Sequence, residues 1–239
     1  EPVKFEDLIK MPDKYCDMIA GTEKLKGYFE DYLLKGYYPF VFEDEESYHE
    51  KMLNIIDKTI YQDISEFYKL KTENLVIFKK IISFLATIPP GELSRNTISK
   101  LTGTDNKTVQ AYLKILFETG LVHLLSENKS GSNLLKSKEK LYLDNPNLYK
   151  AITDETGHDY NTGTMREIFF IKMLENSGKK VFYSNVEDFN VDGLNFEIGG
   201  KNKGRKQIKS DPENSYIVKD DILYGSKREI PLYLFGFLY

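Results

Sequence analysis

The sequence lacks several features that define common classes of protein. It has one cysteine, Cys16, and no tryptophan. A single cysteine excludes a disulfide within the chain and is typical of a reducing compartment. The longest apolar run is LYLFGFLY at residues 232–239, much shorter than the ~20 residues that cross a bilayer. The first residues, EPVKFEDLIK, are charged where a signal peptide would be apolar. We therefore expect a cytoplasmic protein with no membrane partner.

Histidine-based chemistry is also poorly represented. His49, His123 and His158 are scattered, and no two of them have metal-ligand spacing on one helix. His123 lies in the apolar segment LVHLL, which favours a hydrogen-bonded core residue over a metal ligand. With one cysteine the chain has no structural zinc motif, and it shows no serine or cysteine nucleophile motif.

The charge balance is slightly acidic but uneven. The net charge is −4 and the pI about 5.6, so the whole chain lacks the strong positive charge that is typical of nucleic-acid-binding proteins. Residues 43–50 are acidic, whereas residues 201–209 are strongly basic. A local basic segment can still contact phosphates when the total charge is negative.

Hydrophobic periodicity divides the 239 residues into three regions. Residues 1–70 show helical spacing of apolar residues, broken by GYYPF at 36–40. Residues 71–139 have the pattern of a winged helix-turn-helix. Residues 140–239 favour a helix, three short strands, a further helix and a strand. The fold class expected is α+β or α/β, with a mixed sheet flanked by helices.

The middle region has clear boundary signals. An amphipathic helix ends at Pro89-Pro90-Gly91, Ser94 can cap a short second helix, and a third helix follows over 106–119. Gly120 stands where a C-terminal cap belongs, and 121–125 reads as the first strand of a wing. The exposed side of the third helix would present polar residues that can contact phosphates and base edges of DNA: Asn106, Lys107, Gln110 and Lys114.

In the last region, strands are expected at 181–183, 189–191, 194–198 and 216–218, after a helix over 165–176. LYLDNPNLY, which begins at Leu141, reads as a strand that ends in a turn. A basic helix is expected over 205–209.

The stretch NFEIGGKNKGRKQIK, from Asn195 to Lys209, has three interpretations. A phosphate-binding loop of the G-x-x-x-x-G-K-[ST] type is excluded, because Asn195 and Asn202 stand at two obligatory positions. A metal-dependent nuclease site needs carboxylates for Mg²⁺ and a nearby cation. Asp188, Glu197 and Lys201 supply these groups. In the structural alternative, Phe196 and Ile198 face the core and Glu197 is a solvated carboxylate on the other face.

The ordered combination of segments resembles a known family. The segments are DYLLKGYYPF at 31–40, NKTVQAYLKILFETGLV at 106–122, KLYLDNPNLYKAI at 140–152, MREIFF at 165–170, FEIGGKNKGRKQIK at 196–209 and KREIPLYLFGFLY at 227–239. Together they resemble the domain of unknown function 4143, the C-terminal region of bacterial and archaeal AAA-type ATPases. The resemblance implies a fragment that lacks the ATP-binding module, so ATP would bind only in the missing N-terminal domain.

The same resemblance implies a PD-(D/E)XK restriction-endonuclease-like fold for residues 140–239. On that pattern Glu167 is the helix carboxylate, while Asp188 and Glu197 are the strand acids and metal ligands. The sequence departs at position 199, where Gly199 replaces the usual lysine. Lys201 would then need a bulge at Gly199-Gly200 to reach the acids.

Further phosphate contacts are expected from Lys203, Lys206 and Gln207. The sequence thus predicts a nucleic-acid- or protein-binding module with a degenerate nuclease-like fold, partnered by DNA, a protein or the ATPase module. The alternatives are a Mg²⁺-dependent nuclease using Glu167, Asp188, Glu197 and Lys201, and a module that binds only proteins. The oligomeric state stays open.

Overall fold

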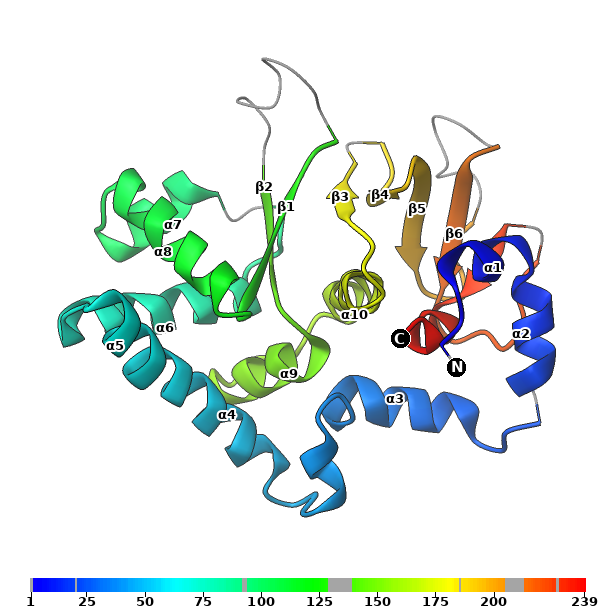
Figure 1. Ribbon diagram of the computed structural model, residues 1–239, viewed down its shortest axis with the longest axis horizontal. Helices are drawn as coiled ribbons and strands as arrows, with labels where there is room; N and C mark the ends of the chain where they lie inside the picture. The colour runs from blue at the N-terminus through cyan, green and yellow to red at the C-terminus, as the bar shows by residue number, and fades with distance from the viewer. Residues whose placement is uncertain are drawn as a thin grey trace. The chain divides into compact units, whose positions relative to one another are not determined.

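A computed structural model describes residues 2–19, 21–91, 94–128, 139–184, 186–204, 213–226 and 228–239. The chain divides into two compact units (Figure 1). We call residues 1–32, 125–138 and 165–239 the sheet unit, and residues 33–124 and 139–164 the helical unit. Within the described ranges, no helix is both long and apolar enough to cross a membrane.

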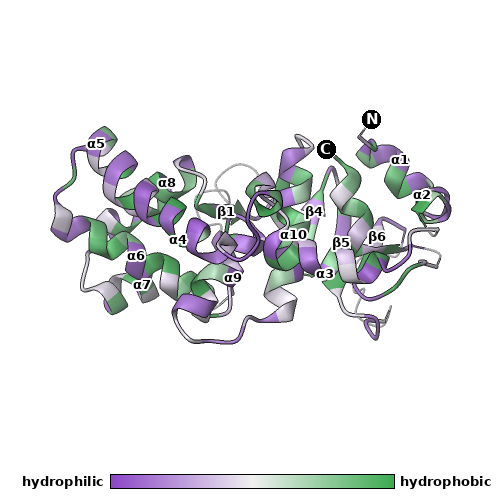
Figure 2. Cartoon of the chain, turned by 90° about the horizontal axis from the view of Figure 1, so that it is seen from below, coloured by the Kyte–Doolittle hydropathy of each residue, from purple (hydrophilic) through white to green (hydrophobic). Residues whose placement is uncertain are grey.

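Helices dominate the N-terminal half, as the sequence predicts. They are α1 (Phe5–Lys10), α2 (Pro12–Ile19), α3 (Leu25–Lys35), the 3-10 helix η1 (Pro39–Phe42), α4 (Tyr48–Lys58), the π-helix η2 (Thr59–Ile64), α5 (Ser65–Tyr68), α6 (Thr72–Thr87), α7 (Arg95–Thr102) and α8 (Asn106–Glu118). Figure 2 shows hydrophilic and hydrophobic residues mixed along α4, α6 and α8, as expected for helices with one buried side. The expected break at GYYPF is confirmed, because α3 ends at Lys35 and η1 begins at Pro39.

Local capping chemistry determines where α7 and α8 begin and end. The Ser94 hydroxyl accepts a hydrogen bond from the Thr97 N–H, and the Asp105 carboxylate accepts from the N–H groups at the start of α8. Such caps contribute about 1 kcal/mol each. Gly120 has φ +70° just after α8, and the Leu121 N–H bonds to the Leu116 carbonyl, which closes the helix with a left-handed residue. The predicted three helices of this region are confirmed.

The segment LYLDNPNLY contains the main error of the sequence-based prediction. β1 (Val122–Ser126) pairs with β2 (Glu139–Leu143), but the expected turn after β2 is the start of a helix, α9 (Pro146–Glu155). The Asn145 side chain accepts from the Leu148 N–H, and Pro146 occupies the first turn, where its missing N–H costs nothing.

A second asparagine of this segment, Asn147, is buried and ties α9 to the preceding helices of the helical unit. Its amide donates to the Leu33 carbonyl at 2.8 Å, and its oxygen accepts from the Tyr37 N–H and the Tyr48 hydroxyl. The NPN run therefore builds a helix start and its anchor.

The sheet unit contains a mixed five-stranded sheet in the order β3-β4-β5-β6-β7. Its elements are β3 (Val181–Tyr183), β4 (Phe189–Val191), β5 (Leu194–Gly199), β6 (Ser215–Lys219), β7 (Glu229–Pro231) and the 3-10 helix η5 (Leu232–Phe237). β4 pairs antiparallel with both β3 and β5, and β6 pairs parallel with both β5 and β7. Asp192 and Gly193, both with positive φ, form the two-residue hairpin between β4 and β5.

Aromatic rings form the core beneath this sheet. Phe170 of α10 (Thr162–Asn176) lies 5.6 Å from Phe189, 5.3 Å from Phe196 and 4.8 Å from Phe235, between ring centroids. Phe196 and Ile198 are buried, so alternation along β5 directs Glu197 to the other side of the strand.

The expected mixed α+β class is confirmed, and the expected strands coincide with β3 to β6. β7 was not anticipated. The basic helix expected over 205–209 lies outside the described residues.

Candidate functional site

The hairpin between β4 and β5 brings Asp188 and Glu197 together. Phe189 pairs with Phe196 across the two strands, so Asp188 lies beside Glu197 just before β4 begins. The Asp188 N–H donates to the Phe196 carbonyl at 3.1 Å, and its carboxylate accepts from the Ile198 N–H at 2.7 Å. Asp188 thus extends the pairing of the strands with its side chain, which fixes the carboxylate at the edge of β5.

Lys203 is the cation that meets these acids. Its ammonium lies 2.6 Å from Glu197 Oε1 and 3.9 Å from Asp188 Oδ2. The same nitrogen donates to the Ile198 carbonyl at 2.8 Å. A turn after β5, closed by the Lys203 N–H and the Gly200 carbonyl at 2.9 Å, reverses the chain so that Lys203 returns over the strand.

Gly199 makes this return possible. A Cβ atom at position 199 would lie 2.2 Å from Lys203 Cδ and 2.9 Å from Lys203 Cβ. These separations are far below van der Waals contact, so any side chain at 199 would displace Lys203. The lysine stem therefore occupies the space that a side chain at position 199 would fill.

Burial and charge repulsion make Glu197 the electrostatically strained member of the cluster. Burial raises the pKa of Glu197 above its ordinary value, the Lys203 hydrogen bond lowers it, and the neighbouring Asp188 and Glu187 carboxylates raise it. The side chains of Glu197, Lys203 and Asp188 are 12%, 21% and 23% exposed. The site is thus largely shielded from solvent, and a positive charge is favourable within it.

The structure brings together some of the predicted catalytic residues and separates another. Asp188 and Glu197 share Lys203, whereas Lys201 is exposed and lies 3.4 Å from Asp221. Glu167 lies on α10 and is partly buried. The sequence predicted only a phosphate contact for Lys203, and not its ion pair with Glu197. The sequence signal for that ion pair was the glycine at position 199, which leaves room for the lysine side chain. Lys206 and Gln207 lie outside the described residues.

A divalent cation of the magnesium type is compatible with these acids. Among the described residues, Asp188 Oδ1 and Glu197 Oε2 have no hydrogen-bond partner. No group of three or more His, Cys, Asp or Glu side chains in the described ranges could hold a metal ion. Mg²⁺, however, is commonly held by one or two carboxylates together with waters and substrate phosphates, and Asp188 and Glu197 fit that arrangement.

A separate polar surface lies on α8 in the helical unit. Its four predicted DNA-contacting residues, Asn106, Lys107, Gln110 and Lys114, are all exposed, whereas the apolar side of α8 is buried. Two acids reduce the positive charge there: Asp105 caps the first turn, and Glu118 lies 3.5 Å from Lys114. The surface is hydrogen-bonding in character and only weakly basic.

His123 has the structural environment expected for it. The side chain is 2% exposed, and its Nε2 lies 2.6 Å from the Asp144 carbonyl oxygen. The partner comes from the turn that follows β2, in the same unit. His123 is thus a hydrogen-bonded core residue.

Comparison with known proteins gives one family. No curated protein and no solved structure matches the chain. Residues 26–159 match the sequence model of a domain of unknown function (DUF8612). The matched range ends before Asp188 and carries no link to AAA-type ATPases or to the domain of unknown function 4143. The matched residues make up more than half of the chain, which therefore belongs to the DUF8612 family.

Proposed function

We propose that the sheet unit is a Mg²⁺-dependent nuclease that hydrolyses phosphodiester bonds in nucleic acid. The observation that carries the proposal is the position of Lys203 against Glu197 and Asp188. The sequence favoured a degenerate site because Gly199 replaces a lysine. The position of Lys203, which reaches the acids from the turn after β5, supports a complete site instead.

The strand order supports the nuclease-like fold that the resemblance implied. α10 is followed by the antiparallel strands β3, β4 and β5, and β6 then pairs parallel with β5. One acid, Asp188, lies just before β4, and the other, Glu197, lies within the neighbouring strand β5.

Each side chain of the cluster has a distinct task. Asp188, fixed by the Ile198 N–H, and Glu197 would hold Mg²⁺, which when bound supplies a Lewis acid for the phosphoryl oxygens. Lys203 limits the repulsion between the two carboxylates and presents a positive charge to an incoming phosphate. An ammonium placed where negative charge develops contributes commonly 10²–10³-fold to the rate.

The direct test is cleavage of fluorescently labelled single-stranded and duplex DNA with Mg²⁺ or Mn²⁺. The wild type should release labelled fragments, and Glu197→Gln and Asp188→Asn should reduce the rate by about 10²-fold or more. EDTA should stop the reaction. Equal cleavage by the wild type and Glu197→Gln would assign the activity to a contaminant and overturn the proposal.

A second candidate function is binding of duplex DNA by α8, and its exposed polar side favours it. The order α6, α7, α8, β1, β2 is the order of a winged helix-turn-helix, in which the third helix enters the major groove. Lys107 and Lys114 are exposed on this side of α8.

Charge reversal tests this helix directly. Lys107→Glu with Lys114→Glu should abolish retardation of duplex DNA at low salt, because phosphate contacts supply most of the non-specific affinity. Lys58→Glu with Lys80→Glu is the matched control, since both lysines are exposed elsewhere in the helical unit. Equal retardation by the two double variants would remove α8 from consideration.

The expected ATPase partner rests on the resemblance alone. A chain that neither cleaves nor binds nucleic acid in these assays would leave a protein-binding role as the remaining expectation.

A further inference from the structure

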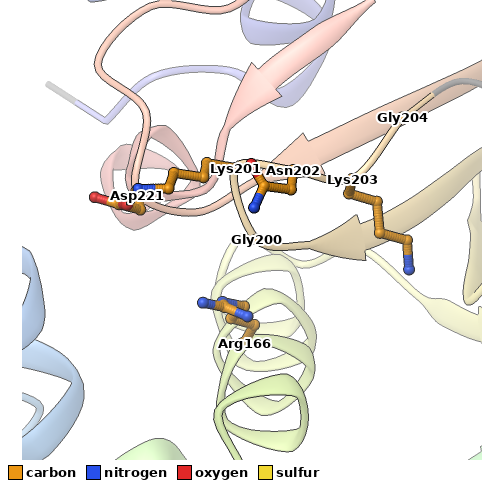
Figure 3. A pocket seen from close by; sticks show the side chains of 7 residues that line it. All are labelled: Arg166, Gly200, Lys201, Asn202, Lys203, Gly204 and Asp221. Atoms are coloured by element: carbon orange, nitrogen blue, oxygen red, sulfur yellow. Dashed lines mark ion pairs between the residues drawn. The ribbon is translucent and has the colours of Figure 1, made fainter.

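A basic pocket opens beside the acid–lysine cluster. Its lining residues are Arg166, Gly200, Lys201, Asn202, Lys203, Gly204 and Asp221, and its volume is about 350 Å³. Figure 3 shows Arg166 projecting from α10 toward Gly200, with Lys201 directed to Asp221 and Lys203 directed away from Lys201. Lys203 thus belongs both to the acid–lysine cluster and to the lining of this pocket.

Arg166 is held in place while its outer groups stay open. Its Nε donates to Asp220 Oδ2 at 2.8 Å, and the two side chains are 20% and 17% exposed. In the part of the chain that the structure describes, the terminal nitrogens of Arg166 have no hydrogen-bond partner. The fixed guanidinium therefore has two donor groups available for a ligand.

Gly200 leaves the approach to these groups free. A Cβ at position 200 would lie 3.5 Å and 3.6 Å from the terminal nitrogens of Arg166. A larger side chain there would cover the guanidinium. The open side of Arg166 thus depends on the absence of a side chain at Gly200.

The donor groups of the lining favour an anion. Arg166 is paired with Asp220 through its Nε alone, and Lys201 is paired with Asp221, while the ammonium of Lys203 is held by Glu197. The Lys201 ammonium lies 3.4 Å from the Asp221 carboxylate, and the two side chains are 62% and 47% exposed. Their pairing is therefore weak and can yield to a stronger partner. A guanidinium with two free donors suits a phosphate, which it can bind through two parallel hydrogen bonds.

We propose that this pocket binds a backbone phosphate of the nucleic acid, next to the phosphodiester that faces Lys203. The proposal rests on the proposed nuclease function and names an additional positioning site for its substrate. A strand that crosses the loop after β5 would place one phosphate at Lys203 and a neighbouring phosphate at Arg166.

The test is fluorescence anisotropy of a labelled oligonucleotide in EDTA, where no cleavage is needed. Arg166→Gln should weaken binding about 10- to 100-fold, as expected for charge-assisted hydrogen bonds. The slope of log affinity against log salt should fall by about 1. Gly200→Leu leaves the ion pair of Arg166 with Asp220 intact and should weaken binding about tenfold. Lys180→Gln is the matched control, because Lys180 is an exposed lysine of the same unit outside the pocket.

Unchanged affinity and salt slope in both Arg166→Gln and Gly200→Leu would overturn the proposal, and so would an equal loss in Lys180→Gln. A loss confined to oligonucleotides with a 5′-phosphate, or full competition by millimolar inorganic phosphate, would show a terminal or free phosphate site and refute the backbone assignment. Because the readout is binding, a failure of DNA cleavage would leave this result interpretable by itself.

Discussion

Replacing Lys203 by methionine should destabilise the sheet unit in a pH-dependent way. The substitution keeps an unbranched side chain as far as the Cε position and removes the ammonium. That group is 2.6 Å from Glu197 Oε1 and 2.8 Å from the Ile198 carbonyl. Its loss leaves Glu197 and Asp188 as neighbouring carboxylates without a shared cation.

The expected cost is about 2 kcal/mol at neutral pH. A hydrogen bond to a charged group contributes about 1.5–3 kcal/mol, and removing one partner of a fully buried ion pair costs about 3–5 kcal/mol. The side chains of Lys203 and Glu197 are 21% and 12% exposed, so solvent screening places the cost at the lower end. For a chain of this size, that lowers the Tm by roughly 4–8 °C.

The sign of the pH dependence follows from Glu197. Because burial holds the pKa of Glu197 above its ordinary value in the folded protein, ionising this group costs more in the folded state than in the unfolded state. Stability is therefore full below the unfolded pKa, about 4.3, and is lost as the pH rises through the folded pKa. Without Lys203 the folded pKa rises further, so the loss is larger.

Thermal unfolding followed by circular dichroism at pH 4 and pH 7.5 measures this difference. Lys203→Met should unfold about 4–8 °C below the wild type at pH 7.5, and the difference should be smaller at pH 4, where only the hydrogen bond to the Ile198 carbonyl is lost. Lys201→Met is the control, because its exposed pair with Asp221 contributes at most about 1 kcal/mol. A Lys203→Met protein that matches Lys201→Met at both pH values would refute the reasoning.

Three further predictions concern local structure. Gly199→Ala should displace Lys203 and reproduce much of the Lys203→Met defect in stability and cleavage, whereas Gly204→Ala, whose Cβ meets nothing within 4 Å, should behave as the wild type in the same assays. Asn145→Ala should lower the free energy of unfolding by about 1–2 kcal/mol in urea titrations, because it removes the cap of α9; an unchanged midpoint would contradict this role. Asp105→Ala should cost about 1 kcal/mol through the cap of α8, and a stabilised variant would show that its charge outweighs its hydrogen bonds.

Much of the fold could be predicted because local chemistry determines it. Ser94 and Asp105 start helices with side-chain hydrogen bonds, and Asp192-Gly193 forms the hairpin that aligns β4 with β5. α9 was missed because Asn145 and Pro146 favour turns as well as helix starts. Only the anchoring of the helix in the core distinguishes the two.

The arrangement of the site was less predictable for a different reason. The pairing of Asp188 with Glu197 follows from a short hairpin, so spacing along the chain sufficed to suggest it. The identity of the lysine depends on how the chain turns after Gly199, and on the space that this glycine leaves for Lys203. Spacing alone favoured Lys201, but its ammonium is paired with the Asp221 carboxylate. Arg166 gave no signal, because its role depends on Asp220 and Gly200 in three dimensions.

The most direct test of the account compares DNA cleavage by Lys203→Met and Lys201→Met in the presence of Mg²⁺, with both proteins shown to be folded at the assay temperature. Lys203→Met should lose about 10²-fold or more of the wild-type rate, while Lys201→Met should keep most of it. Loss of cleavage in Lys201→Met together with full activity in Lys203→Met would contradict the account.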